Sequence, residues 1–238
     1  ISWPLFLVPL AFKNADAQTR QVITTVAFAL AMWGPGIAAI VATLTSGGSF
    51  RDLNLRRLGS KRFYLWAWLL FPILTIVSSV VTVLFGLGEF DPNFTMINDM
   101  LPASETLNPA LIVAAQVGAA LTIAPLFNTL FAMGEELGWR GFLLPKLLPL
   151  GQWKAILISN IIWGLWHAPV VAQGLNYPGY PIAGILMMVV FTLLLGTIFS
   201  WLYLNTKSPW TPALAHGSVN AVAGLPVLVH VLRQRDLR

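Results

Sequence analysis

Two adjacent glutamates are the residues of this sequence best placed to do chemistry. Glu135 and Glu136 lie in the apolar stretch FAMGEELGWRGFLLP, and no other acidic residue occurs between Glu105 and Asp236. A charged side chain near the centre of a bilayer costs roughly 2.5–3.5 kcal/mol. We therefore expect these carboxylates to belong to a polar site held within a membrane.

Arg140 follows four positions after Glu136, so on a helix the two side chains are neighbours in the favourable order, acid before base. Glu135 then points about 100° away from that pair. This spacing predicts a structural ion pair between Glu136 and Arg140 and leaves Glu135 for chemistry. The alternative is a helix end at the membrane surface, where all three side chains extend to water.

Two histidines and an asparagine occur in other apolar segments. His167 ends the stretch NIIWGLWH, and Trp163 lies four positions earlier on the same helix face, where its ring can hold the imidazole. His216 and Asn220 stand one turn apart in HGSVN. Taken singly, such a residue is more often an interhelical hydrogen-bonding group than a catalyst.

The spacing of these groups predicts that they meet at one depth. Gly151 is midway between Glu135 and His167, and a helical hairpin that turns there would bring both side chains to one level. His216 lies near the start of the last apolar segment. A carboxylate, two imidazoles and a carboxamide gathered in one place are suited to hydrolysis.

The composition indicates the kind of protein that must position these groups. The chain is 57% hydrophobic and only 10% charged, whereas a soluble domain carries about 25% charged residues. The net charge of +5 comes from basic residues in short loops, which indicates membrane topology and not nucleic-acid binding. Cysteine is absent, which excludes disulfides and thiolate chemistry.

We therefore predict an all-α, polytopic transmembrane helical bundle. The chain should form a single integral membrane domain, 1–238, with its motif-bearing core at about 110–222. A span needs about 20 apolar residues. The expected helices are the tail of a first one at 1–12, then 22–44 with a kink at Gly34, 63–87, 110–133 continuing through the glutamates, 155–171, 182–204 and 210–232.

Loop charges predict the orientation of the chain. Segment 51–62 carries five Lys and Arg against one Asp, which favours the cytoplasmic side, and segment 88–109 is acidic. The polar site should accordingly face the cytoplasm. Seven spans would place the basic tail 233–238 outside, so the expected number of spans is about seven or eight.

The three polar stretches resemble a known signature, E-E-x-x-x-R, then F-x-x-x-H, then H-x-x-x-N. It is similar to that of the CPBP family of intramembrane proteases, which includes type II CAAX prenyl endopeptidases and bacterial homologues linked to bacteriocin processing or immunity. The resemblance covers roughly 110–222, and Trp163 stands where the family commonly has Phe.

The resemblance implies an intramembrane endopeptidase that cuts a membrane-associated peptide or a lipidated protein, such as one with a prenylated C-terminus. Glu135 and His167 would activate a water, and His216 and Asn220 would stabilise the oxyanion. Glu136 and Arg140 would organise the site. The expected partners are this substrate and the lipid bilayer, and no nucleic acid is expected.

The need for a metal stays open at this point. Glu135, His167 and His216 could supply three ligands of a catalytic zinc, with water as the fourth. The zincin helix H-E-x-x-H is missing. We favour a metal-free mechanism without any cofactor and keep Zn²⁺ as the alternative.

Two other functions remain as alternatives. An ion-coupled transporter also places acids and histidines inside the membrane, but this sequence shows no inverted repeat. A non-catalytic immunity or scaffold protein would keep the fold and tolerate loss of Glu135.

Overall fold

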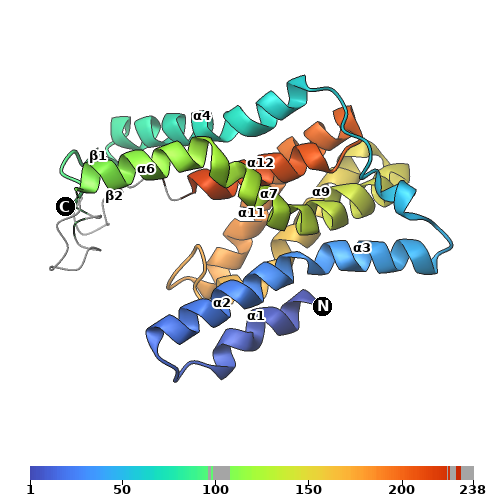
Figure 1. Cartoon of the computed structure of the whole chain (residues 1–238), viewed down its shortest axis with the longest axis horizontal. Helices are drawn as coiled ribbons and strands as arrows, with labels where there is room; N and C mark the ends of the chain where they lie inside the picture. The colour runs from blue at the N-terminus through green and yellow to red at the C-terminus, as the bar shows by residue number, and fades with distance from the viewer. Residues whose placement is uncertain (96–97, 99–107, 224, 226–228, 232–238) are drawn as a thin grey trace. The chain divides into compact units, whose positions relative to one another are not determined.

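The computed structural model describes residues 1–95, 98, 108–223, 225 and 229–231. The basic tail and much of the acidic loop predicted at 88–109 lie outside these residues. Figure 1 shows helices throughout the described chain. One two-stranded sheet is also present among the described residues. The helices are α1 Ser2–Ala11, α2 Ala17–Met32, α3 Gly34–Thr45, α4 Arg62–Leu84, α6 Pro109–Leu121, α7 Ile123–Glu136, α8 Leu144–Leu147, α9 Gln152–Trp166, α10 Ala168–Ala172, α11 Pro181–Thr206 and α12 Trp210–Val222.

The predicted class, a helical membrane protein, is confirmed. Among the described residues, three helical segments are long and apolar enough to cross a membrane: Ala17–Thr45, Arg62–Leu84 and Pro181–Thr206. A fourth is possible if Pro109–Leu121 and Ile123–Leu150, bent by 53° at their junction, form one broken span. The expected number of seven or eight spans stays a prediction.

The described chain divides into two compact units. The first comprises Ile1–Phe63 and Leu130–Ala213, and the second comprises Tyr64–Thr129 and Leu214–Arg238. The prediction of a single domain over 1–238 stays a prediction, and each unit is described by itself below.

In the first unit, the predicted kink at Gly34 is confirmed. Helix α2 ends at Met32, and α3 begins at Gly34, after the single residue Trp33. Pro35 lies in the first turn of α3, where a missing N–H costs nothing. A Cβ at Gly36 would lie 2.6 Å from the carbonyl oxygen of Gly134. Glycine at this position therefore lets the backbone of α3 touch the end of α7, which carries the glutamates.

The segment after the glutamates is not an ordinary α-helix. Residues Leu137–Leu143 form a π-helix, η2, which continues into α8 and a 3-10 turn, η3 Leu148–Leu150. Gly151 then has φ 101°, a backbone conformation that favours glycine, and α9 begins at Gln152. The predicted hairpin turn at Gly151 is confirmed, whereas the π-helix was not expected.

Helices α9 and α11 pack tightly in the first unit. A Cβ at Gly164 of α9 would lie 2.7 Å from the Cα of Val189 in α11, so glycine allows this close approach. Such small residues are typical of helix pairs in membranes. Leu53, in the 3-10 turn η1 Phe50–Leu53, packs with Met133 and Leu137 in a separate buried cluster.

The second unit contains most of α4, α6, the start of α7 and most of α12. The Trp68 indole donates to the Leu121 carbonyl (2.9 Å), and the Ser218 hydroxyl donates to the Trp68 carbonyl (3.0 Å), which joins α4 to α6 and α12. Strands β1 Gly88–Phe90 and β2 Val229–Val231 pair antiparallel. The predicted helix 210–232 is wrong in its second half, because α12 ends at Val222 and 229–231 forms a strand.

Candidate active site

Glu136 and Arg140 form the ion pair that their spacing predicted. The Arg140 Nη1 donates to both carboxylate oxygens of Glu136, at 2.9 and 3.1 Å. Both side chains are fully buried, and Glu135 is only 2% exposed. The alternative in which these side chains extend to water at the membrane surface is therefore wrong.

The Arg140 guanidinium makes further contacts besides its ion pair with Glu136. Its Nη2 donates to Oδ1 of Asn160 at 3.0 Å, and the guanidinium carbon lies 4.2 Å from the centroid of the Trp163 ring. The centroid of the Phe199 ring, in α11, lies 5.2 Å from the same guanidinium carbon. Arginine suits such a position because its planar group donates several hydrogen bonds and stacks on aromatic rings. Arg140 thus joins η2 to α9 and α11.

Trp163 connects this ion pair to Glu135. Its indole Nε1 donates a 2.7 Å hydrogen bond to Oε2 of Glu135, between buried side chains 28 residues apart. The indole is 2% exposed. This hydrogen bond fixes the orientation of the Glu135 carboxyl group. Glu135 is therefore held by Trp163, whereas Glu136 is held by Arg140.

His167 lies directly after α9, at its C-terminal cap. Its Nδ1 is 2.9 Å from the Trp163 carbonyl oxygen, which only accepts, so Nδ1 is the donor. In the neutral imidazole the lone pair is then on Nε2. The ring also packs edge-on against Trp163 at 5.8 Å and Trp166 at 4.7 Å. The prediction that Trp163 holds the imidazole is confirmed, and the same residue contacts Glu135.

An apolar cavity of about 610 Å³ adjoins these residues in the first unit. Trp3, Trp139 and Trp166 line it, together with small residues of α3 such as Ala38 and Ala42. Trp166 lines the cavity and also packs against the His167 ring. Gly164 and Gly196 do not line this cavity and lie at close contacts between α9 and α11.

His216 and Asn220 belong to α12 in the second unit. His216 is buried at 6% exposure and Asn220 is exposed. Between them, Gly217 fits tightly against the start of α7, since a Cβ there would lie 2.5 Å from the Pro125 carbonyl oxygen. Asn128 also donates to the Gly217 carbonyl at 3.3 Å. The convergence of His216 and Asn220 with Glu135 and His167 stays a prediction.

The alternative zinc site at Glu135, His167 and His216 also stays a prediction. In the part of the chain that the structure describes, no group of three or more His, Cys, Asp or Glu side chains is placed to hold a metal. Two of the three residues nevertheless have features that metal ligands share. His167 donates from Nδ1 to a carbonyl, and the Glu135 carboxylate is oriented by an indole.

Two residues in this region were missed by sequence reasoning. Asn160 is fully buried and binds Arg140. The indole Nε1 of Trp139 is buried with no hydrogen-bond partner among the described residues. The sequence offered one signal for each residue. Asn160 is a polar residue seven positions before His167, and Trp139 lies inside the motif E-E-x-x-x-R.

Comparison with known proteins gives two matches. A family model described as type II CAAX prenyl endopeptidase Rce1-like matches residues 117–222, a range that contains all six predicted site residues. A protein of Methanococcus maripaludis named CAAX prenyl protease 2 is 26% identical over 181 residues. That match covers 71% of this chain and 58% of the relative.

Both matches are described as CAAX prenyl proteases or endopeptidases. They support the resemblance to the CPBP family of intramembrane proteases that the three motifs predicted.

Proposed function

We propose that this protein is an intramembrane endopeptidase that hydrolyses a peptide bond in a membrane-associated substrate. The observation that carries the proposal is the placement of Glu135 and His167 on one tryptophan: Trp163 donates to Glu135 from its ring and accepts from His167 at its carbonyl. A carboxylate and an imidazole are side-chain groups that can accept a proton from water near neutral pH.

In this mechanism Glu135 and His167 orient a water and take its proton while the water oxygen attacks the scissile carbonyl carbon. The proton then passes to the amide nitrogen as the C–N bond breaks, which leaves a carboxylic acid and an amine. The motif resemblance assigns stabilisation of the oxyanion to His216 and Asn220. Such a donor contributes about 2.7–4 kcal/mol in known cases. Glu136 and Arg140 hold the local framework.

The cavity and the comparisons support a proposed substrate class. An apolar cavity of about 610 Å³ beside His167 suits a hydrophobic or lipidated segment. The relative's name supports a protein with a prenylated C-terminus. The basic segment 51–62 supports an active site that opens toward the cytoplasm.

We propose a metal-free reaction and keep zinc as the alternative. If zinc takes part, Glu135, His167 and His216 would hold it, and the ion would lower the pKa of its bound water. Metal analysis of active protein, with a chelator titration, distinguishes the two. Activity that persists without stoichiometric metal supports the first mechanism.

The decisive experiment is cleavage of a farnesylated C-a-a-X peptide by protein reconstituted in liposomes. Glu135→Gln keeps a hydrogen-bond acceptor for Trp163, so it should fold normally and lose at least about 10²-fold in rate. His167→Ala should behave alike, and His216→Ala and Asn220→Ala should lose about 10²–10³-fold. Lys154→Gln, an exposed change, is the matched control.

Turnover retained by Glu135→Gln would refute the mechanism. If the wild type cleaves the same peptide equally well without the farnesyl group, the lipid part of the substrate assignment is wrong. Solute flux without any cleaved product would instead identify a transporter.

A further inference from the structure

A second, basic pocket lies in the first unit, in the segment that follows α3. Its volume is about 470 Å³, and Phe50, Arg51, Asn54, Leu55, Arg56 and Arg57 line it. It shares no lining residue with the tryptophan-lined cavity beside His167. The catalytic proposal above does not use it.

Contacts with the rest of the first unit fix the backbone of this pocket. Leu53 is 1% exposed and packs in the core, and the Trp210 indole donates to the Leu55 carbonyl at 2.8 Å. Asn54 has a φ of 55°, a left-handed conformation, and its backbone N–H donates to the Arg51 carbonyl. These contacts constrain the backbone of the segment from which the arginine side chains extend.

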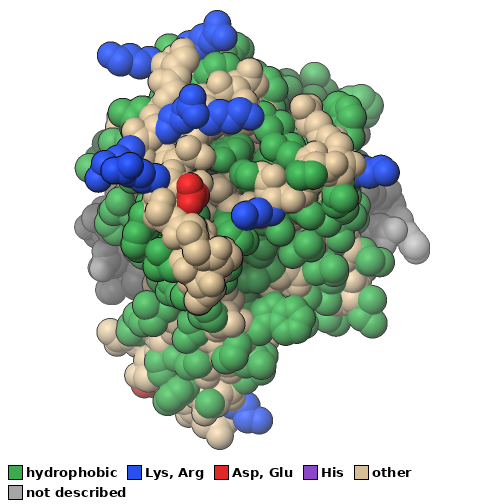
Figure 2. Space-filling view, turned by 90° about the vertical axis from the view of Figure 1, so that its right-hand side faces the viewer, with side chains coloured by type: hydrophobic (Ala, Val, Ile, Leu, Met, Phe, Trp, Pro, Cys, Tyr) green, Lys and Arg blue, Asp and Glu red, His purple; other side chains and the backbone are tan. Residues whose placement is uncertain are grey.

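The positive charge of the pocket has little local compensation. Asp52 is the one acidic residue of segment 51–62, and its Oδ2 accepts from the Ser49 backbone N–H at 2.7 Å in a capping box. Arg51, Arg56 and Arg57 are all exposed. Figure 2 shows Lys and Arg side chains gathered on one end of the face in view, with little acidic surface among them.

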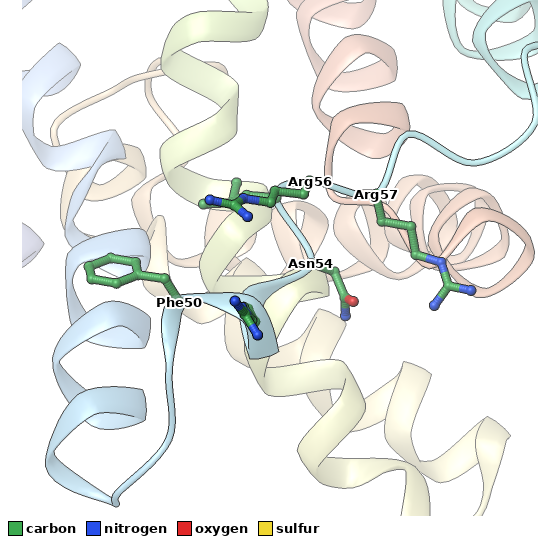
Figure 3. Close-up of a pocket in the computed structure, with 6 residues that line it drawn as sticks. Phe50, Asn54, Arg56 and Arg57 are labelled. Carbon is green, nitrogen blue, oxygen red and sulfur yellow. The ribbon is translucent and has the colours of Figure 1, made fainter.

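The pocket combines this charge with apolar surface. Figure 3 shows Phe50 and Arg56 extending to the same side of the segment, whereas Arg57 extends to the opposite side. The Phe50 ring is 56% exposed although it is a large hydrophobic group. A ligand with an anionic group next to a hydrocarbon part would satisfy both features.

Position along the chain indicates where that ligand is found. One candidate span ends at Thr45 and the next begins at Arg62, so the pocket belongs to a short loop at the membrane surface. Lipid headgroups lie at this level, and the cytoplasmic leaflet is rich in anionic lipids that attract basic segments. Arginine is well suited to phosphate because its planar fork matches two phosphate oxygens.

We propose that this pocket binds the phosphate group of an anionic phospholipid, with Arg51 and Arg56 at the phosphate and Phe50 against the adjoining hydrocarbon. The bound lipid would anchor the loop between the two spans. A free phosphate ion has the same anionic chemistry but gains nothing from Phe50, so the experiment separates the two sources.

The test measures binding to the full chain in detergent by native mass spectrometry, with dioctanoyl phosphatidylglycerol, dioctanoyl phosphatidylcholine and inorganic phosphate as probes. Wild type should retain phosphatidylglycerol in preference to phosphatidylcholine. Arg51→Gln/Arg56→Gln should weaken phosphatidylglycerol binding by on the order of tenfold or more. Lys13→Gln/Lys154→Gln removes two exposed charges outside the pocket and should bind as wild type does.

Equal phosphatidylglycerol binding by Arg51→Gln/Arg56→Gln and wild type would overturn the proposal, and so would an equal loss in the Lys13→Gln/Lys154→Gln control. Inorganic phosphate that binds as tightly as phosphatidylglycerol would overturn the assignment to lipid. If the glutamine variant fails to fold, Arg51→Lys/Arg56→Lys keeps the charge, and it should bind more weakly than wild type because the planar fork is lost. Wild-type binding by this lysine variant would then count against the arginine assignment.

Discussion

The indole of Trp163 donates a 2.7 Å hydrogen bond to Glu135, and the face of the same ring lies 4.2 Å from the Arg140 guanidinium carbon. One side chain thus contacts both the proposed base and the ion pair that supports it. Its carbonyl oxygen also accepts from Nδ1 of His167. Trp163 is therefore the residue through which the first two motifs act on each other.

Replacement of Trp163 by Phe separates these roles. The ring stays, and so does the backbone carbonyl that binds His167, but the N–H to Glu135 is lost. Hydrogen bonds to charged groups contribute about 1.5–3 kcal/mol, so we expect kcat/KM to fall about 10–100-fold with little loss of stability. Steady-state cleavage kinetics check this.

Trp153→Phe changes an exposed tryptophan and is the control. Full activity of Trp163→Phe would show that the indole bond is dispensable, in line with the phenylalanine common in the family.

The ion pair is expected to contribute to stability more than to chemistry. Arg140→Ala or Glu136→Ala leaves a buried charge without its partner, which costs about 3–5 kcal/mol. Thermal unfolding in detergent should show a large loss for either variant and none for Lys154→Ala, which is exposed. The double variant should lose less than the sum of the two single changes. Additive losses would mean that the two residues do not act as a pair.

Gly196 of α11 is predicted to be indispensable for the position of Arg140. A Cβ there would collide with Oδ1 of Asn160 and lie 2.6 Å from Nη2 of Arg140. We expect Gly196→Ala to cost about 1–3 kcal/mol through overpacking and to lower activity as the guanidinium shifts. Gly118→Ala in α6 meets no atom within 4 Å and should be neutral or slightly stabilising. Equal stability of the two variants, measured by thermal unfolding, would contradict the packing argument.

Trp139 is expected to affect substrate binding. It lines the cavity, and its buried Nε1 has no hydrogen-bond partner among the described residues. If it donates to a substrate carbonyl, Trp139→Phe removes about 0.5–1.5 kcal/mol of binding and raises KM about 2–10-fold with kcat unchanged. A fall in kcat at constant KM would assign Trp139 to the chemical step instead.

Several features followed from the sequence because they depend on near neighbours in the chain. The Glu136–Arg140 pair is set by four-residue spacing, the kink at Gly34 by glycine and proline, and the turn at Gly151 by a short run of turn residues. Apolar composition alone identified a helical membrane protein. The end of α12 at Val222 was missed, because residues 223–232 remain apolar and a strand gives the same composition as a helix.

The chain by itself therefore determined the class of protein, the three motifs and the short-range pairing of Glu136 with Arg140. Tertiary structure decided that Asn160 completes the bonding of Arg140, that Trp163 binds Glu135 and that a cavity lies beside His167. These hydrogen bonds join α7 and η2 to α9, between residues that are 20 and 28 positions apart in sequence. Glycine at 196 leaves the room that Asn160 and Arg140 occupy beside α11, and no four-residue spacing could have indicated this packing.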